Sequence, residues 1–270
     1  MPLYQAIVLA IIQGLTEFLP VSSTAHLTLF PWFLGWKDPG LTFDVALHAG
    51  TLVAVLVYFW RIWVDMLLAA AGLGQGSAAE IEEKRKLFWY LVVGTIPGGI
   101  AGFLFEHAAE EQLRRPMIIG VAMIVVALLM WAGERFSRRE EGLGQVTFPD
   151  SIVVGAAQAF AVIPGVSRSG VTMTAGLFRN MTRETAARFS FLLSTPLIAG
   201  GALKMGLEIR HEGLPPEMKL PFAVGIIVSG LVGYVVIAWL IRYLERRTFT
   251  VFIVYRLALG VVVLAWGLRS

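Results

Sequence analysis

Two short stretches of the 270-residue sequence combine residue types that could carry out phosphate chemistry. The first runs from Gln13 through Glu17 and Pro20 to a hydroxyl-rich segment that ends at His26. In a helix, Gln13 and Glu17 stand one turn apart on one face, so they can hold one ligand or divalent cation together. His26 follows Ser23 by three residues, a spacing that lets an imidazole exchange a proton with the hydroxyl in a helical turn. Glu17, Ser23 and His26 are therefore candidate catalytic residues.

The second stretch reads PGVSRSGVT at residues 164–172 and has the composition of an anion site. A glycine-containing turn that leads into a helix offers backbone N–H groups and the positive end of the helix dipole to an anion. Arg168 adds a planar guanidinium that can bind two phosphate oxygens at once, which makes it a further catalytic candidate. The residues predicted to bind phosphate are Gly165, Ser167, Arg168, Ser169, Gly170 and Thr172.

The composition indicates a membrane protein. Hydrophobic residues make up 57% of the chain and charged residues only 15%, where a soluble domain has about 25% charged residues. The net charge of +3 is too small to indicate a nucleic-acid partner. The chain has no cysteine, which excludes disulfides, thiolate metal sites and a cysteine nucleophile. The N-terminal segment lacks a basic region and a small-residue cleavage site, so we expect it to be retained as a membrane element.

Apolar runs near the length of a bilayer core predict six transmembrane helices. Their expected ranges are 43–62, 87–105, 116–134, 186–205, 221–243 and 249–268. Two further apolar segments, 4–35 and 151–180, are broken by Pro20 or Pro164 and by runs of Ser, Thr and Gly. We predict that each is a re-entrant helical hairpin. Irregular backbone at membrane depth must lie inside protein or line a wet cavity, so the polar hairpin tips should form the site.

The two hairpins predict an inverted-topology repeat. A shift of 145 residues aligns Gln13 with Gln158 and Ser22 with Ser167. Three predicted crossings separate the hairpins, and this odd number would invert the second half relative to the first. The tips would then meet near the midplane, as broken helices do in inverted-repeat transporters. The predicted fold is an all-α integral membrane protein with one domain over 1–270, built from repeats at about 1–140 and 146–270.

Loop charges predict the orientation in the membrane. Basic residues concentrate in the segments 80–86, 134–141 and 242–247, whereas 106–115 begins with acidic residues. Positively charged loops tend to be cytoplasmic, so the first three segments are expected on the cytoplasmic side and the fourth on the opposite side.

Other polar residues are given structural interpretations. Asp44 and His48 are four residues apart in a predicted span and could pair with each other. His107, His211 and the acidic cluster at 106–111 are expected to be solvated loop residues. The charged residues at 183–188 are expected to form a surface with pairing along a helix.

The two chemical stretches resemble the signatures of the undecaprenyl-diphosphate phosphatase family, long associated with bacitracin resistance. The first signature, a Glu or Gln followed by Glu and a PVSSTxH-like tip, corresponds to Gln13, Glu17 and PVSSTAH at 20–26. The second, PGxSRSxxT, matches throughout at 164–172. The likeness extends over the whole chain and includes FSFLLSTP at 189–196. Many members have Glu where this chain has Gln13, so the motif here supplies one carboxylate and one amide.

The resemblance implies removal of one phosphate from the C55 isoprenyl diphosphate, which recycles the cell-wall lipid carrier. It also implies a divalent cation, Mg²⁺ or Ca²⁺, for which Glu17 and Gln13 are the candidate ligands. A homodimer in the bacterial inner membrane, with an active site that opens to the extracytoplasmic side, is expected on the same ground. The nucleophile is left open among Ser23, His26 and a water molecule.

Two alternatives to this reading exist. A transporter of lipid-linked or inorganic phosphate would share the inverted repeat and the anion site. Transport needs Arg168 but no proton-transfer pair, so Glu17 and His26 beside Ser23 favour hydrolysis. The lipid-phosphate phosphatase family is disfavoured because Thr174 stands where its SRxxxxxH pattern has histidine.

Overall fold

The structure is a computed structural model that describes residues 1–111 and 113–267, and every regular element in these ranges is a helix. The side chains of the acidic cluster at 106–111, His107 included, lie outside the described part. The α-helices are α1 Leu3–Thr16, α2 Ser23–Leu34, α3 Leu41–Tyr58, α4 Trp60–Ala70, α5 Ala78–Glu111, α6 Pro116–Phe136, α7 Phe148–Ala159, α8 Arg168–Phe178, α9 Arg183–Glu212, α10 Pro216–Leu244 and α11 Thr250–Gly267. Two short 3-10 helices, η1 Leu143–Gln145 and η2 Phe160–Val162, lie beside α7.

Six of these helices are long and apolar enough to cross a membrane. They are the helices α3, α5, α6, α9, α10 and α11. Their positions confirm the six predicted spans, and the chain is a multi-span membrane protein. Large apolar side chains on these helices are exposed, as expected of surfaces that face lipid.

Several segments predicted to be loops are helical in the structure, because 80–86 and 106–111 belong to α5 and His211 belongs to α9. The charged segment after residue 60 forms α4, a short helix that follows α3 after a break at Phe59. The predicted spans 186–205 and 221–243 are shorter than the helices observed, since α9 continues to Glu212 and α10 starts at Pro216. Charged side chains that reach water at a helix end do not stop a helix, so charge alone misplaced these boundaries.

Small residues allow the spanning helices to pack closely. A Cβ added at Gly50 of α3 would lie 2.1 Å from the hydroxyl of Ser229 on α10, which donates to the carbonyl of Leu47. The pair α6 and α11 has the same feature. A Cβ added at Gly120 would lie 3.2 Å from the carbonyl oxygen of Gly260, and one added at Gly260 would lie 3.0 Å from that of Gly120. Such contacts gain van der Waals packing, which drives helix association in lipid where the hydrophobic effect is weak.

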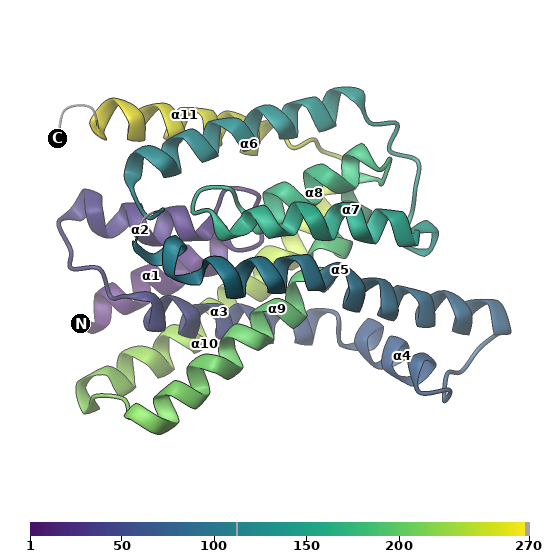
Figure 1. The fold of residues 1–270 in the computed structure, drawn as a ribbon, viewed down its shortest axis with the longest axis horizontal. Coiled ribbons are helices and arrows are strands. Elements are labelled where there is room, and N and C mark those ends of the chain that lie inside the picture. Colours follow the sequence, from purple (N-terminus) through teal and green to yellow (C-terminus); the bar gives the residue numbers. More distant parts are fainter. Residues whose placement is uncertain (112, 268–270) are drawn as a thin grey trace.

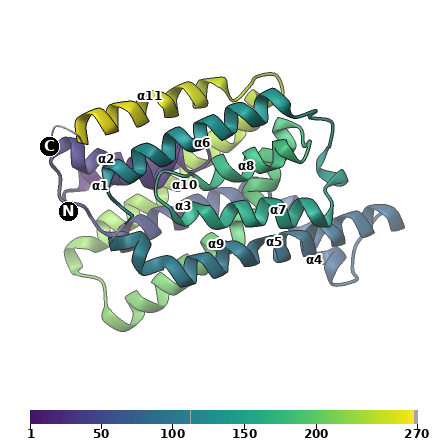
Figure 2. The same cartoon turned by 45° about the horizontal axis from the view of Figure 1, so that its top comes forward.

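The helices α1 and α2 form one hairpin, and α7 and α8 form a second (Figure 1). The first hairpin opens toward the end of the molecule that holds the N-terminus, and the second opens toward the opposite end (Figure 1). Their tips meet in the interior of the bundle, and the view in Figure 2 shows the same arrangement. That the hairpins are re-entrant, and that the two halves form an inverted repeat, stay predictions.

The aligned serines have the same local geometry in both tips. Ser22 and Ser167 have φ values of 77° and 70°, which residues other than glycine rarely adopt. Each is an N-cap, since the Ser22 hydroxyl accepts from the amide of Ala25 and the Ser167 hydroxyl from that of Gly170. Such a backbone conformation costs about 1–3 kcal/mol and persists where the surroundings require it, commonly at functional sites.

The open end of the second hairpin is closed by an ion pair. Arg179, just after α8, lies 2.5 Å from the carboxylate of Asp150 at the start of α7. The amide and hydroxyl of Thr147 donate to the same carboxylate. Burial acts to raise the pKa of Asp150, but the hydrogen bonds from Thr147 and Arg179 outweigh it and hold that pKa below its usual range.

The basic segments gather at one end of the bundle. The carboxylate of Glu134 pairs with Arg139 and Arg183 and also accepts a hydrogen bond from the amide of Phe249. These contacts hold together the connections α6–α7, α8–α9 and α10–α11. The segment 80–86 lies beside residues 143–146 at this end. The end of α5 and residues 113–115 lie at the other end (Figure 1). The predicted grouping of the loops is therefore present, and the assignment of membrane sides stays a prediction.

Candidate active site

The two tips are in direct contact, as the sequence predicts. Arg168 lies 3.9 Å from the carboxylate of Glu17, measured between Nη2 and Oε1. The hydroxyl of Ser169 is within 3.2 Å of the backbone carbonyls of Glu17 and Leu19. Residues about 150 positions apart in the sequence are thus joined by side-chain to backbone contacts.

Arg256 of α11 links both tips to the spanning helices. Its side chain is fully buried, and within the described residues no carboxylate pairs with it. Its Nη1 donates to the carbonyl of Pro20 in the first tip, and its Nη2 to those of Gly165 and Val166 in the second. Its Nε donates to the carbonyl of Met123 on α6. A rigid guanidinium can serve several acceptors at fixed angles, so this residue sets the relative position of the tips.

The carboxylate of Glu17 is the centre of the site. Its Oε2 accepts from the hydroxyl of Ser23 at 2.6 Å and from the amide of Gln13 at 3.1 Å. The ring of His48, on α3, lies 3.3 Å from the same oxygen. Glu17 is only 8% exposed, so these donors and Arg168 replace the water that its charge would otherwise require.

His48 is oriented to act as a cation. Its Nδ1 lies 2.7 Å from the carbonyl of Asp44, which can only accept a hydrogen bond, and its Nε2 faces Glu17. A neutral imidazole has only one N–H, so a proton on both nitrogens is needed to satisfy both acceptors. With His48 and Arg168 positive and Glu17 negative, the site has a net positive charge that favours a phosphate anion.

His26 does not make the contact predicted for it. Its Nδ1 donates to the carbonyl of Ser22 at 2.7 Å, so its Nε2 accepts from the hydroxyl of Tyr255 at 2.6 Å. Both ring nitrogens are therefore occupied, and Ser23 donates to Glu17 instead. The helical turn of α2 directs the His26 ring toward α11. Asp44 and His48 do meet, but through the backbone carbonyl of Asp44, since the Asp44 carboxylate binds Arg114.

The residues predicted to bind phosphate fall into two groups. Nη1 of Arg168 is buried without a hydrogen-bond partner among the described residues, so it is a free donor for an anion. The hydroxyls of Ser167 and Ser169 already cap α8 and join the tips. Thr172 is completely buried, and its hydroxyl contacts Arg168's carbonyl and Ser190. Thr172 therefore packs α8 against α9 and does not face the site.

Gly165 and Gly170 support the second tip by close approach. Gly165 has a φ of +94°, and a Cβ there would lie 2.7 Å from the carbonyl of Ile119 on α6. A Cβ at Gly170 would lie 3.0 Å from the Cβ of Ser167. A side chain does not fit at Gly165, and at Gly170 it would require Ser167 to shift by a few tenths of an ångström, so both glycines favour a tight tip beside Arg168.

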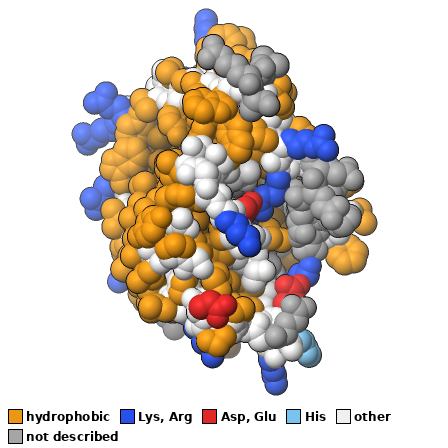
Figure 3. All heavy atoms as spheres, turned by 90° about the vertical axis from the view of Figure 1, so that its left-hand side faces the viewer, with side chains coloured by type: hydrophobic (Ala, Val, Ile, Leu, Met, Phe, Trp, Pro, Cys, Tyr) orange, Lys and Arg blue, Asp and Glu red, His pale blue; other side chains and the backbone are white. Residues whose placement is uncertain are grey.

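A cavity of about 250 Å³ extends from His48 toward the end of the bundle at which the first hairpin opens. Thr24 and Thr28 of α2 line one side, and Pro164 of the second tip lines another. Arg114 lies on its wall and pairs with Asp44 at 3.0 Å and with Asp38 at 3.3 Å. Figure 3 faces this end of the molecule, where basic and acidic side chains lie together within a largely hydrophobic surface. We call this space the polar cavity because Asp44, His48 and Arg114 line it, and it reaches the Glu17 site at His48.

The residues around Glu17 can accommodate a hard divalent cation. Oε1 of Gln13 is fully buried and has no hydrogen-bond partner in the described part of the chain. It is an oxygen donor on the same helix face as the Glu17 carboxylate, and Mg²⁺ and Ca²⁺ prefer oxygen ligands. Among the described residues, no three His, Cys, Asp or Glu side chains form a metal-binding group. A cation here would therefore take its other ligands from water and substrate.

Three residues of the site were not identified from the sequence. His48 had been considered only with Asp44, and Arg256 and Tyr255 had been read as part of an apolar span. The signal that marks Arg256 is its charge inside an otherwise apolar helix, which is costly unless the residue has a function or a dedicated set of partners.

The fold and this site define a multi-span membrane protein in which two helical hairpin tips bring a buried carboxylate, Glu17, together with Arg168. Residues 6–262 match the family model described as bacitracin resistance protein BacA, so the chain belongs to this family. It is 49% identical to an undecaprenyl-diphosphatase of Moorella thermoacetica, with 98% of both chains covered. It is 46% identical to the undecaprenyl-diphosphatase of Pelotomaculum thermopropionicum, covering 98% of this chain and 96% of that protein. These similarities do not favour the transporter alternative.

Proposed function

We propose that this protein hydrolyses undecaprenyl diphosphate to undecaprenyl phosphate and inorganic phosphate. The observation that carries the proposal is the contact between the tips. The Glu17 carboxylate accepts a hydrogen bond from Ser23 and lies 3.9 Å from the guanidinium of Arg168. This arrangement combines a nucleophile, a proton acceptor and an anion-binding cation. The name of the relatives, undecaprenyl-diphosphatase, supplies the substrate.

In the proposed reaction, the hydroxyl oxygen of Ser23 attacks the terminal phosphorus atom. The bond from this phosphorus to the bridging oxygen breaks, and undecaprenyl phosphate leaves with the bond electrons on that oxygen. Glu17 takes the hydroxyl proton, which the 2.6 Å hydrogen bond already directs toward its carboxylate. Water then hydrolyses the phosphoserine, releasing inorganic phosphate and restoring the Ser23 hydroxyl. Direct attack by water at the same place would use the same proton acceptor.

Arg168 and His48 supply the electrostatic part of the mechanism. The free Nη1 of Arg168 donates to a non-bridging oxygen of the terminal phosphate, where charge is spread during transfer. His48 holds the Glu17 carboxylate in place through its Nε2. Fixed donors in a buried site stabilise this charge without having to reorganise, which is a large part of phosphoryl-transfer catalysis.

A divalent cation, Mg²⁺ or Ca²⁺, is part of the proposal. Glu17 and the unpartnered Oε1 of Gln13 would hold it. When bound, it would neutralise charge on the diphosphate oxygens. One carboxylate and one amide make a weak site, which fits a cation that arrives together with the substrate phosphates.

The orientation of the protein in the membrane and its oligomeric state are also part of the proposal. The basic connections at one end support a cytoplasmic location for that end, so the 250 Å³ cavity would open on the extracytoplasmic side. The family resemblance supports a homodimer in the bacterial inner membrane, where the enzyme would return the lipid carrier to cell-wall synthesis.

The direct test is phosphate release by detergent-purified protein from undecaprenyl diphosphate, with and without Mg²⁺. We expect release with Mg²⁺ and none after addition of a chelator. Glu17→Gln serves as the negative control, because both routes use the Glu17 carboxylate as the proton acceptor. If the wild-type protein binds the lipid but releases no phosphate at any cation concentration, the hydrolase assignment is wrong and transport becomes the better reading.

A further inference from the structure

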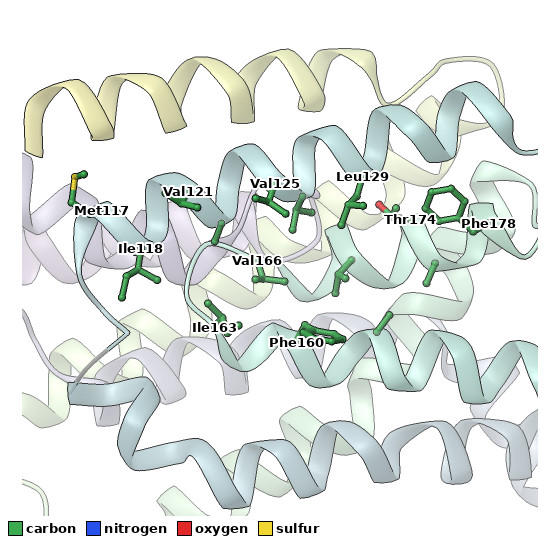
Figure 4. Close-up of a pocket in the computed structure, with 15 residues that line it drawn as sticks. Met117, Ile118, Val121, Val125, Leu129, Phe160, Ile163, Val166, Thr174 and Phe178 are labelled. Carbon is green, nitrogen blue, oxygen red and sulfur yellow. The ribbon is translucent and has the colours of Figure 1, made fainter.

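An apolar groove lies on the side of the bundle. It has a volume of about 750 Å³ and lies between α6 on one side and the second hairpin on the other. Val121 and Val125 of α6 face Phe160 and Val166 across it (Figure 4). Its one hydroxyl group, that of Thr174, already donates to the carbonyl of Gly170. The groove therefore offers packing and no free polar group.

The groove and the polar cavity share a wall, which is the segment before the second tip. Val162 and Pro164 line the polar cavity, whereas Ile163 and Val166 line the groove. The two spaces also approach each other where α6 begins. Arg114 lines the polar cavity, and Met117, three residues later, lines the groove. The two spaces therefore lie on opposite sides of one short segment, so the charged head and the apolar tail of a single molecule could occupy them together.

We propose that this groove binds the isoprenoid tail of the substrate while its diphosphate occupies the polar cavity, which is lined by His48 and Pro164. The proposal rests on the function proposed above, which requires such a head and tail. The groove follows α6 from Met117 to Leu129, a length of about 18 Å at 1.5 Å per residue. It is open along the side of the bundle, so the part of a long tail beyond its end can continue into the membrane.

The physical role of the groove is to orient the tail. Lipid chains are as apolar as valine or leucine, so transfer of the tail from the bilayer into the groove gains nothing from the hydrophobic effect. Its contribution comes from van der Waals packing against fixed side chains. A tail held in this direction places the diphosphate beside the second tip, which reduces the orientational freedom lost at the reaction step.

A pair of tryptophan variants on α6 tests the proposal. Val125 lines the groove and is 49% exposed, whereas Leu128 on the same helix is 53% exposed and lies outside it. Each variant is assayed in detergent against undecaprenyl diphosphate and farnesyl diphosphate, whose tails have eleven and three isoprene units. We expect Val125→Trp to lower kcat/KM for the long substrate about tenfold more than for the short one, through overpacking of the groove. Leu128→Trp should change neither value.

The outcomes separate this inference from the proposed function. If the wild-type protein releases phosphate from neither substrate, the proposed function fails. If it hydrolyses both and Val125→Trp changes the two equally or not at all, the tail does not lie in the groove.

A second measurement does not depend on tolerance of tryptophan. The chain has no cysteine, so single cysteines at Val125 and Leu128 can be modified selectively with a membrane-soluble maleimide. Undecaprenyl phosphate, which keeps the tail and is not consumed, should slow modification at Val125 at least about threefold and leave Leu128 unchanged. Equal protection of Val125 by phosphatidylglycerol would assign the groove to ordinary membrane lipid and overturn the inference.

Discussion

Arg256 donates a hydrogen bond to the backbone carbonyl of Pro20 at 3.1 Å, across 236 positions of the sequence. The same guanidinium also binds two carbonyls of the second tip. The broken backbone of both hairpins therefore has its acceptors satisfied by one buried cation, which solves the problem that irregular backbone poses inside a membrane. The site depends on a residue that does not face it.

From this relationship we expect Arg256→Lys to lower kcat about tenfold to a hundredfold with little change in KM, because the two tips lose their common anchor. Lysine keeps the charge but offers its donors from a single point. Arg242→Lys, at an exposed position on α10, is the matched control and should behave as wild type. The thermal unfolding midpoint of each variant separates loss of positioning from loss of the fold. Wild-type kcat in a folded Arg256→Lys protein would contradict a positioning role.

Arg168→Lys should reduce turnover about tenfold to a thousandfold, at roughly 1.4 kcal/mol for each factor of ten. Lysine cannot reproduce the planar pair of donors, one of which is free in the structure. Phosphate release from undecaprenyl diphosphate is the measurement. Arg188→Lys, whose parent residue pairs with Glu184 along α9, is the control. Unchanged turnover in Arg168→Lys would place this arginine outside the reaction.

His48→Gln should lower kcat/KM by about tenfold to a hundredfold, because glutamine can donate to Glu17 but carries no charge. The site would then lose one of its two cations beside the carboxylate. His211→Gln, at an exposed position on α9, should have no effect. If His48→Gln is fully active while His26→Gln is inactive, the imidazole needed for catalysis is the one that contacts Tyr255.

Gln13→Glu should lower the Mg²⁺ concentration that gives half-maximal activity, because it adds a second carboxylate to the proposed cation site. Binding to the folded state also raises stability, so Mg²⁺ should raise the thermal unfolding midpoint more in this variant than in the wild type. Gln5→Glu on the same helix is the control. A midpoint that does not respond to Mg²⁺ or Ca²⁺ in either protein would argue against a cation held by Gln13 and Glu17.

The hairpin arrangement predicts which positions share a membrane side. Cysteines placed at Tyr4, at the start of the first hairpin, and at Lys37, after its end, should both react with an impermeant thiol reagent from outside the cell. A cysteine at Gln145, before the second hairpin, should react only after the cytoplasmic side is exposed. All three positions are exposed in the structure. Reaction of Tyr4 and Lys37 cysteines from opposite sides would show that the first hairpin crosses the membrane.

Much of the architecture follows from the order of residues alone. Apolar runs are nearly as long as a bilayer is thick, and this local property predicted all six spanning helices. Proline and hydroxyl residues marked the tips. A shift of 145 residues aligned Ser22 with Ser167, and both serines have the same unusual backbone conformation in the structure. Helical geometry alone also predicted that Gln13 and Glu17 lie on the same face of α1.

Only the tertiary structure decided which side chains meet. The periodicity of α2 places His26 one turn from Ser23 but does not say that Tyr255 lies beside its ring. His48 and Arg256 act on the tips from helices that the sequence presents as apolar spans, and Thr172 looked suited to phosphate until α9 covered it. Local sequence determines which segments enter the membrane, because hydrophobicity and chain stiffness are local. Contacts between distant helices depend on how their surfaces pack, and no single segment contains that information.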